Sequence, residues 1–159
     1  MKRIVVSIPR QELQLFEDER LLRSYTVSTA LKGAGEQSGS EMTPRGQHIV
    51  RAKIGAGLPL YAVLRGRRPT GELWSEALAA QHPGRDWILS RILWLSGTEP
   101  GRNRLGQQDS MRRYIYIHGT PDTEPMGVPA SHGCVRMRNT ELVELFDQVP
   151  AYTPVLIEG

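Results

Sequence analysis

Residues Tyr114–Arg138 read YIYIHGTPDTEPMGVPASHGCVRMR and contain the only cysteine of the chain, Cys134. The first four residues alternate aromatic and aliphatic side chains, and this period of two predicts a strand that ends at His118. In such a strand the aromatic side chains and His118 share one face. Prolines and glycines fill the next segment, which predicts a loop that returns the chain to Ser131-His132-Gly133-Cys134. A histidine at a strand end can thus lie opposite a cysteine on a glycine-containing turn.

Two separated blocks within this stretch, His118-Gly119-Thr120 and Ser131-His132-Gly133-Cys134-Val135-Arg136-Met137, resemble the signature of the YkuD family, the L,D-transpeptidase catalytic domain. The spacing between the first histidine and the cysteine suits that family. Residues 3–29 look like the opening β-meander of the family, and Thr43-Pro44-Arg45-Gly46 looks like its Thr-Pro-x-Gly element. The resemblance covers nearly the whole chain and is weakest between residues 55 and 83.

Composition and patterning predict one mainly β domain over residues 1–159. That length can bury a sizeable core, and 16 glycines with 11 prolines suit a turn-rich β fold. Short β-type runs separated by short turns favour antiparallel pairing. Residues 72–81 and 139–149 have helical character, the second with Asn139 or Thr140 as its cap. We expect a mainly β fold with one or two helices, and the resemblance implies the antiparallel β-sandwich of the YkuD type.

Cys134 and His118 have the side chains of a nucleophile and its base. An unperturbed thiol, with a pKa near about 8.5, is only a few per cent ionised at neutral pH, and a neighbouring imidazolium lowers that pKa to roughly 3.5–7.5. His132 is two residues from the cysteine, which makes direct pairing of ring and sulfur awkward, whereas His118 arrives from another strand. The resemblance implies the same base, and it implies that the carbonyl of Gly119 orients the ring.

Further residues are predicted to bind substrate. The amides of Gly133 and Cys134 are candidates for an oxyanion hole. Arg136 shares the face of Cys134 if the segment is extended, so its guanidinium can bind a substrate carboxylate. His132 either contacts substrate or is a hydrogen-bonded structural residue, and the polar loop 96–110 is either a wall of a substrate groove or an ordinary surface loop. The predicted substrate-binding set is Arg136, His132, Ser131, Tyr116 and Asn103, of which Ser131 also suits a turn.

Several other functions compete with a cysteine enzyme. A zinc site could use Cys134, His118 and His132, but structural zinc sites need four ligands and the chain has no second cysteine. A lone cysteine is often a buried structural residue, and a catalytically silent protein could bind murein stems with the same fold. The polar residues around Cys134 argue against a buried structural cysteine. The joint presence of Cys134, His118 and Gly133 argues against a silent binder, which needs no thiol. We expect no metal and no cofactor.

The resemblance implies attack on the peptide bond between the third residue of a peptidoglycan stem tetrapeptide, an L-centre such as that of diaminopimelate, and the D-Ala that follows it. A thioester then remains on the cysteine. Transfer of the acyl group to an amine makes a 3→3 cross-link, and transfer to water leaves a tripeptide. The expected partners are therefore peptidoglycan stem peptides or soluble muropeptides.

Charge and hydropathy bear on partners and location. The formal charge is +3, and 17 of the 20 basic residues are arginines, which suits anionic peptides. Arg112-Arg113-Tyr114 is too short a run to predict nucleic-acid binding. No segment approaches the roughly 20 apolar residues of a membrane span, and the apolar run before Pro9 is shorter than the about 7–15 residues of a signal peptide. We expect a cytoplasmic L,D-carboxypeptidase of murein recycling, or a periplasmic L,D-transpeptidase if a leader has been removed.

Overall fold

One ten-stranded sheet with two α-helices makes up the structure, a computed structural model that describes residues 1–159. The mainly β prediction with two helices is therefore confirmed. In chain order the elements are β1 (Lys2–Ser7), β2 (Glu12–Glu17), β3 (Arg20–Ser28), β4 (Gly46–Ile54), β5 (Ala62–Arg65), β6 (Arg68–Leu73), α1 (Glu76–Gln81), β7 (Ile88–Gly97), the 3₁₀ turn η1 (Gly106–Gln108), β8 (Tyr116–Gly119), β9 (Val135–Met137), α2 (Asn139–Gln148) and β10 (Pro154–Glu158).

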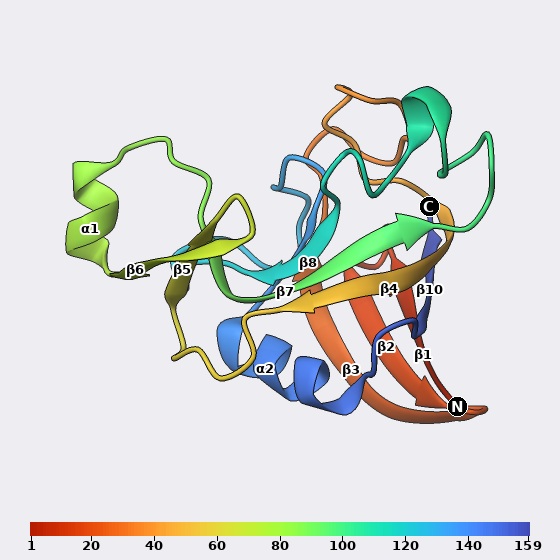
Figure 1. Ribbon diagram of the computed structural model, residues 1–159, viewed down its shortest axis with the longest axis horizontal. Coiled ribbons are helices and arrows are strands. Elements are labelled where there is room, and N and C mark those ends of the chain that lie inside the picture. The colour runs from red at the N-terminus through yellow and green to blue at the C-terminus, as the bar shows by residue number, and fades with distance from the viewer.

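The sheet closes on itself. Its strand order is β4-β10-β1-β2-β3-β9-β8-β7-β5-β6, and an additional pairing of β4 with β7 joins the two sides into a barrel-like sheet. The hairpin β5–β6 and the helix α1 extend from β7 and lie outside the barrel, on the left of Figure 1. Closure leaves few free strand edges, because most strands pair on both sides.

The expectation of an antiparallel sandwich needs correction. β1 pairs with β10 in parallel, and β8 pairs with β9 in parallel. Short turns do produce antiparallel pairs among β1, β2 and β3, as the sequence pattern indicated. The parallel pairs involve strands that are joined by longer segments, and a long crossover removes the constraint that a tight turn imposes. The result is a mixed, closed sheet.

The segment between β4 and β7 also differs from expectation. The predicted helix 72–81 begins only at Glu76, because Arg68–Leu73 pairs with β5 as a strand. Ser75 caps this short helix by accepting a hydrogen bond from the Leu78 N–H at 3.0 Å. Gly66 and Arg67 form the two-residue hairpin turn, and both have the positive φ angles that such turns require. The arginine-rich run Arg65–Arg68 is this turn with its flanking residues.

The core fills the barrel, and α2 packs against β7 and β8. A cluster of 19 buried apolar residues includes Leu142, Leu145 and Phe146 of α2. Fully burying one such side chain contributes roughly 1.5–3 kcal/mol relative to leaving it exposed. The predicted cap of α2 was wrong: Arg138 is the N-cap and makes no side-chain capping bond. The side chain of Asn139 is instead bonded to two other segments of the chain.

Arg91 lies in the apolar strand β7 and has no carboxylate partner, although a buried charge usually needs one. Its buried guanidinium donates to the carbonyl oxygens of Leu58 and Ser90, both at 2.8 Å, and lies over the Phe146 ring at 5.6 Å. Backbone carbonyl oxygens therefore take the place of an anionic partner for Arg91.

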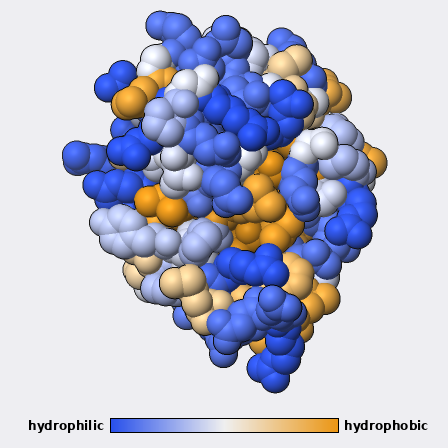
Figure 2. Space-filling view, turned by 90° about the vertical axis from the view of Figure 1, so that its right-hand side faces the viewer, coloured by the Kyte–Doolittle hydropathy of each residue, from blue (hydrophilic) through white to orange (hydrophobic).

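The outer face of the barrel near the chain ends shows an apolar area ringed by hydrophilic residues (Figure 2). On β1 and β10 the outward positions include Val5 and Leu156, which are partners in register and half-buried.

No helix of the structure is long and apolar enough to cross a bilayer.

Candidate active site

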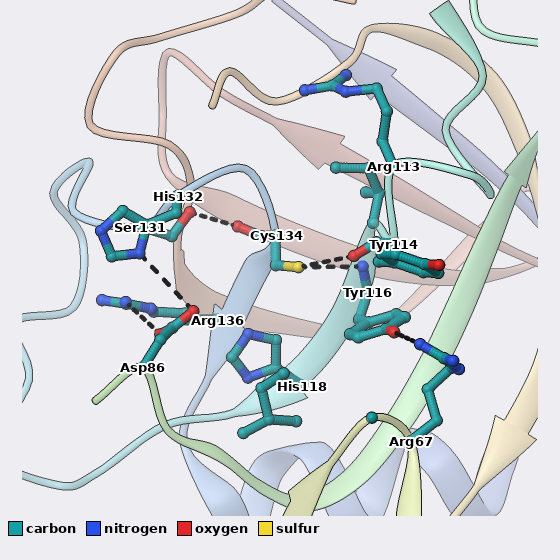
Figure 3. Close-up of a pocket in the computed structure, with 13 residues that line it drawn as sticks. Arg67, Asp86, Arg113, Tyr114, Tyr116, His118, Ser131, His132, Cys134 and Arg136 are labelled. Carbon is teal, nitrogen blue, oxygen red and sulfur yellow. Dashed lines mark hydrogen bonds and ion pairs between the residues drawn. The ribbon is translucent and has the colours of Figure 1, made fainter. Parts of the chain in front are cut away.

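A cavity of about 410 Å³ lies beside β8 and the turn that precedes β9, and it contains both predicted catalytic side chains. This volume lies within the range of small-molecule sites, about 300–1,000 Å³. Figure 3 shows Cys134 in its centre, with residues contributed by several distant segments on either side. The lining residues are Gly66, Arg67, Asp86, Ile88, Arg113, Tyr114, Ile115, Tyr116, His118, Ser131, His132, Cys134 and Arg136.

His118 lies on β8, as the alternation predicted, and its ring is buried beneath the cavity. Its Nδ1 lies 2.7 Å from the carbonyl oxygen of Gly119. A carbonyl can only accept a hydrogen bond, so Nδ1 carries the proton and Nε2 is left as the basic nitrogen. Burial lowers the pKa of His118, so the imidazole is neutral near pH 7. The structure therefore shows the predicted orientation of the ring by Gly119.

Gly119 is closely surrounded. A Cβ at this position would overlap the Asn139 Oδ1 and the carbonyl oxygen of Leu89. Asn139 donates from Nδ2 to the Thr120 carbonyl at 2.8 Å, and its Oδ1 accepts from the Ser90 hydroxyl at 2.7 Å. The first residue of α2 thus fixes the strand end that orients His118. The sequence pattern indicated Asn139 only as a helix cap, so this positioning role was missed.

The thiol of Cys134 lies between two backbone groups of the β8 segment. Its Sγ accepts from the Tyr116 N–H and donates to the Tyr114 carbonyl, each at 3.3 Å. Burial raises the pKa of Cys134 to about 12. The lowered pKa of His118 and the raised pKa of Cys134 both favour an uncharged imidazole and an uncharged thiol in the resting pair, which differs from the expected imidazolium that lowers the thiol pKa. Catalytic hydrogen bonds are often formed only when substrate is bound.

The turn before the nucleophile is held by side-chain hydroxyls. Ser131 Oγ donates to the Cys134 carbonyl at 2.6 Å and accepts from the Gly133 N–H at 3.2 Å. Thr43 donates to the Gly133 carbonyl at 2.9 Å, which explains why the Thr-Pro-x-Gly element accompanies this turn. Gly133 has φ +134°, a conformation that other residues rarely adopt. Its amide is engaged by Ser131, so of the two predicted oxyanion donors only the Cys134 N–H has no partner in the protein.

Arg136 lines the cavity and is only 7% exposed, but its charge is already paired. It donates to Asp86 at 3.1 Å and lies 3.7 Å from Glu124. The exposed ring of His132 lies 3.7 Å from the same Asp86. A substrate carboxylate would compete with two protein carboxylates for Arg136, so the predicted role of this arginine in binding substrate stays a prediction, as does that of His132.

At the other end of the cavity Arg67 lies among aromatic rings. Its guanidinium donates to the Tyr116 hydroxyl at 3.1 Å and lies over the Tyr114 and Trp94 rings, 4.7 Å and 5.0 Å from their centroids. Tyr116, predicted to bind substrate, lines the cavity but is itself 4% exposed. Its phenol therefore contributes mainly by holding Arg67.

Asn103 does not belong to the site. Its side chain is fully buried and lies outside the cavity, where Nδ2 donates to the carbonyls of Arg45 and Gln47 at 3.1 and 3.0 Å. Its Oδ1 accepts from the Glu99 N–H at 3.0 Å. The amide fixes the loop after β7 against β4, which corrects its assignment to substrate binding. Burial of these backbone groups requires such partners.

Three charged lining residues were missed, namely Arg67, Arg113 and Asp86. The basic runs around Arg67 and Arg113 were visible in the sequence, but nothing there distinguishes a lining arginine from its exposed neighbours. Arg113 donates four hydrogen bonds to residues 35–42 and so holds this segment beside the site. Asp86 follows α1 without any recognisable motif.

The closed β-sheet places Cys134 and His118 in one cavity, and the carbonyl of Gly119 contacts the His118 ring. The sequence matches the YkuD family, the L,D-transpeptidase catalytic domain, over residues 1–157, and the chain belongs to that family. It is 31% identical over 155 residues to a protein of Bacillus subtilis (strain 168) whose name is "Putative L,D-transpeptidase YqjB". That alignment covers 97% of this chain and 69% of YqjB.

Solved structures show the same fold. L,D-transpeptidase 3 of Mycobacterium tuberculosis is similar with a TM-score of 0.61 at 14% identity, over 99% of this chain and 61% of that one. An L,D-transpeptidase solved in complex with imipenem is similar with a TM-score of 0.58 at 18% identity, over 98% of this chain and 58% of that one. The chain thus spans about three fifths of these solved proteins.

Proposed function

We propose that this protein is a cysteine peptidase of peptidoglycan stems. It cleaves a tetrapeptide between its third residue and the terminal D-Ala, and water is the main acceptor, which makes it an L,D-carboxypeptidase. The observation that carries the proposal is the placement of Cys134 and His118 in one cavity, with the Nδ1 of the ring committed to Gly119. Membership of the YkuD family supports the same substrate class.

The neutral resting pair sets the order of proton transfers. Cys134 Sγ attacks the carbonyl carbon of the third residue while its proton passes to His118 Nε2. The developing oxyanion accepts a hydrogen bond from the Cys134 N–H. Loss of one such donor typically costs on the order of 3 kcal/mol in the transition state. Collapse breaks the C–N bond, and the imidazolium returns the proton to the amine of the departing D-Ala. A thioester remains.

Water then resolves the thioester by the reverse sequence. The neutral His118 accepts a proton from water, the hydroxyl oxygen bonds to the acyl carbon, and collapse releases the tripeptide acid and the Cys134 sulfur, which regains the proton. The accessibility of Cys134 supports water as the acceptor. The side chain is only partly buried at the cavity, so water can reach a thioester on its sulfur.

Incubation with a stem tetrapeptide alone tests the choice of acceptor. We expect tripeptide and free D-Ala to accumulate in equal amounts, because water reaches the thioester more readily than a second stem. Mass spectrometry over time measures both products, and a reaction without enzyme is the control. Dimers linked 3→3 as the dominant product at modest substrate concentration would identify a transpeptidase instead.

We propose the cytoplasm as the compartment and soluble muropeptides as the substrates. The single cysteine needs no disulfide partner, and a reducing compartment keeps its thiol in the reactive form. Fractionation of cells that produce the native gene product should place it with cytoplasmic markers. Recovery with periplasmic markers would contradict this location and favour cross-linking as the activity.

A further inference from the structure

The cavity has two ends, on opposite sides of Cys134 (Figure 3). One end contains the ion pair of Asp86 with Arg136, and the other contains Arg67 with its aromatic neighbours. The reaction proposed above also has two sides, because the acyl group stays on sulfur while D-Ala leaves. A stem tetrapeptide therefore presents its terminal carboxylate to one of these ends.

The arginines that line the cavity differ in how far their charge is satisfied. Arg136 is buried against Asp86 and Glu124, so it is already neutralised. Arg113 is half-buried, donates its hydrogen bonds to the segment 35–42, and points away from the thiol in Figure 3. The one unpartnered nitrogen of Arg136, Nε, is buried away from solvent, and the charge of this guanidinium is already paired. Arg113 would have to break its hydrogen bonds to bind a new anion.

Arg67 has no carboxylate within ion-pair distance. Its partners are the uncharged hydroxyl of Tyr116 and the faces of the Tyr114 and Trp94 rings. Aromatic faces orient a guanidinium without neutralising it, and its remaining donors match the two oxygens of a carboxylate. The hairpin turn fixes the backbone from which the side chain extends, since Arg67 holds φ +65°. The site is therefore a preformed cation beside the nucleophile.

We propose that Arg67 binds the free α-carboxylate of the terminal D-Ala and so restricts the enzyme to stems that end at that residue. This inference rests on the proposed peptidase function. In the substrate, the scissile nitrogen and one α-carbon separate the reacting carbonyl carbon from the carboxylate carbon, a separation of about one residue length, ~3.5 Å. Tyr116 bridges the sulfur and the guanidinium: its N–H donates to Cys134 Sγ, and its hydroxyl accepts from Arg67.

The proposal predicts selectivity for a free chain end. A pentapeptide carries an uncharged amide where the tetrapeptide has its carboxylate, and its extra residue would meet the wall that Arg67 forms with Tyr114. A tetrapeptide with a C-terminal carboxamide has the same size as the acid and lacks only the charge. Hydrogen bonds to charged groups contribute more than neutral ones, so the wild-type kcat/KM should be roughly 10–100-fold higher for the acid than for the carboxamide.

The experiment compares these two peptides with the wild type, Arg67→Gln and Arg65→Gln. Glutamine at position 67 can still donate to Tyr116 but has no charge. We expect Arg67→Gln to lower kcat/KM for the acid by roughly 10–100-fold and to leave the carboxamide unchanged, so that the two values become similar. Arg65 is exposed in the same hairpin and does not line the cavity, so Arg65→Gln should keep the wild-type ratio.

Two results would overturn the inference. An unchanged ratio in Arg67→Gln shows that the arginine does not sense the terminal charge. A parallel loss for both peptides shows a structural role, or binding of a side-chain carboxylate at the third residue. Alkylation of Cys134 by uncharged iodoacetamide should proceed at the wild-type rate in Arg67→Gln, which confirms that the site has kept its shape.

Measurements of peptide binding distinguish a failure of the Arg67 inference from a failure of the proposed peptidase function. If the wild type cleaves neither peptide, the peptidase proposal fails, and titration calorimetry of both peptides on Cys134→Ala still tests Arg67. We expect the acid to bind roughly 10–100-fold more tightly than the carboxamide, and we expect this difference to vanish when Arg67→Gln is added. Equal affinities on Cys134→Ala, or no binding of either peptide, would overturn the carboxylate site.

Discussion

Replacement of Cys134 by alanine should lower the turnover of a stem tetrapeptide by roughly 10⁴–10⁶-fold, the range observed when a covalent nucleophile is removed. The thiol is the only cysteine of the chain, lies in the centre of the cavity, and is held by the Tyr116 N–H and the Tyr114 carbonyl. Release of D-Ala, followed by mass spectrometry, measures the loss.

Labelling with a covalent probe tests the role of Cys134 independently of turnover. If Cys134 carries the acyl group, a carbapenem should acylate its thiol, adding one mass to the wild type and none to Cys134→Ala. Cys134→Ser controls for shape, because it keeps a donor at the same position while providing a weaker nucleophile. Labelling that persists in the alanine variant, or turnover that survives it, would assign the acyl group to another residue. A silent stem-binding protein would bind the peptide without either signal.

The sequence was sufficient to predict which side chains meet at the centre of the site. Alternation from Tyr114 to Ile117 predicted that His118 and the isoleucines lie on opposite faces of the strand, and the structure places His118 at the cavity and the isoleucines in the core. These predictions depend on local periodicity, which the backbone preserves whatever the rest of the fold does. Tyr114 is the exception: it precedes β8, has φ +57°, and is 52% exposed.

The periphery of the site could not be predicted in the same way. Arg67 and Asp86 enter the cavity from a hairpin and a loop whose position depends on pairing with β7, a contact between distant parts of the chain. Asn103 is the converse case, because a polar side chain in a loop looks the same in sequence whether it binds a ligand or satisfies buried backbone groups. Its hydrogen bonds to the carbonyls of Arg45 and Gln47 show that it satisfies buried backbone groups.

Strand direction was the weakest part of the fold prediction. Short turns gave the antiparallel order of β1, β2 and β3. The parallel pair β1–β10 joins the two ends of the chain, and the parallel pair β8–β9 is connected by the loop 120–134. Hydrophobic alternation fixes which face of a strand is buried and contains no information on the direction of its neighbour. The closure of the sheet through β4 and β7 is likewise a property of the whole chain.

The neutral pair of Cys134 and His118 leads to a second large effect, in the pH dependence of alkylation. Because burial raises the pKa of the thiol to about 12, the free thiolate is scarce at neutral pH, and reaction depends on transfer of the proton to His118. His118 has a pKa lowered by burial, so it stays a competent base below the usual imidazole range. The wild-type rate with iodoacetamide should therefore be nearly constant above about pH 6.5 and should decline at lower pH, where the imidazole becomes protonated.

His118→Ala should lower that rate at pH 7 by roughly 10²–10⁴-fold, the usual contribution of a general base, and should restore a rate that rises steadily with pH. The same loss is expected in tetrapeptide turnover. His132→Ala should affect alkylation far less, because its ring is largely exposed and faces Asp86, whereas that of His118 is buried beneath the thiol. His118→Gln and urea unfolding separate loss of the base from loss of stability, since removing a buried ring leaves a cavity. If His132→Ala slows alkylation more than His118→Ala, the two histidines have the opposite roles. A wild-type rate that keeps rising above pH 7 would show that the thiol ionises without help from His118.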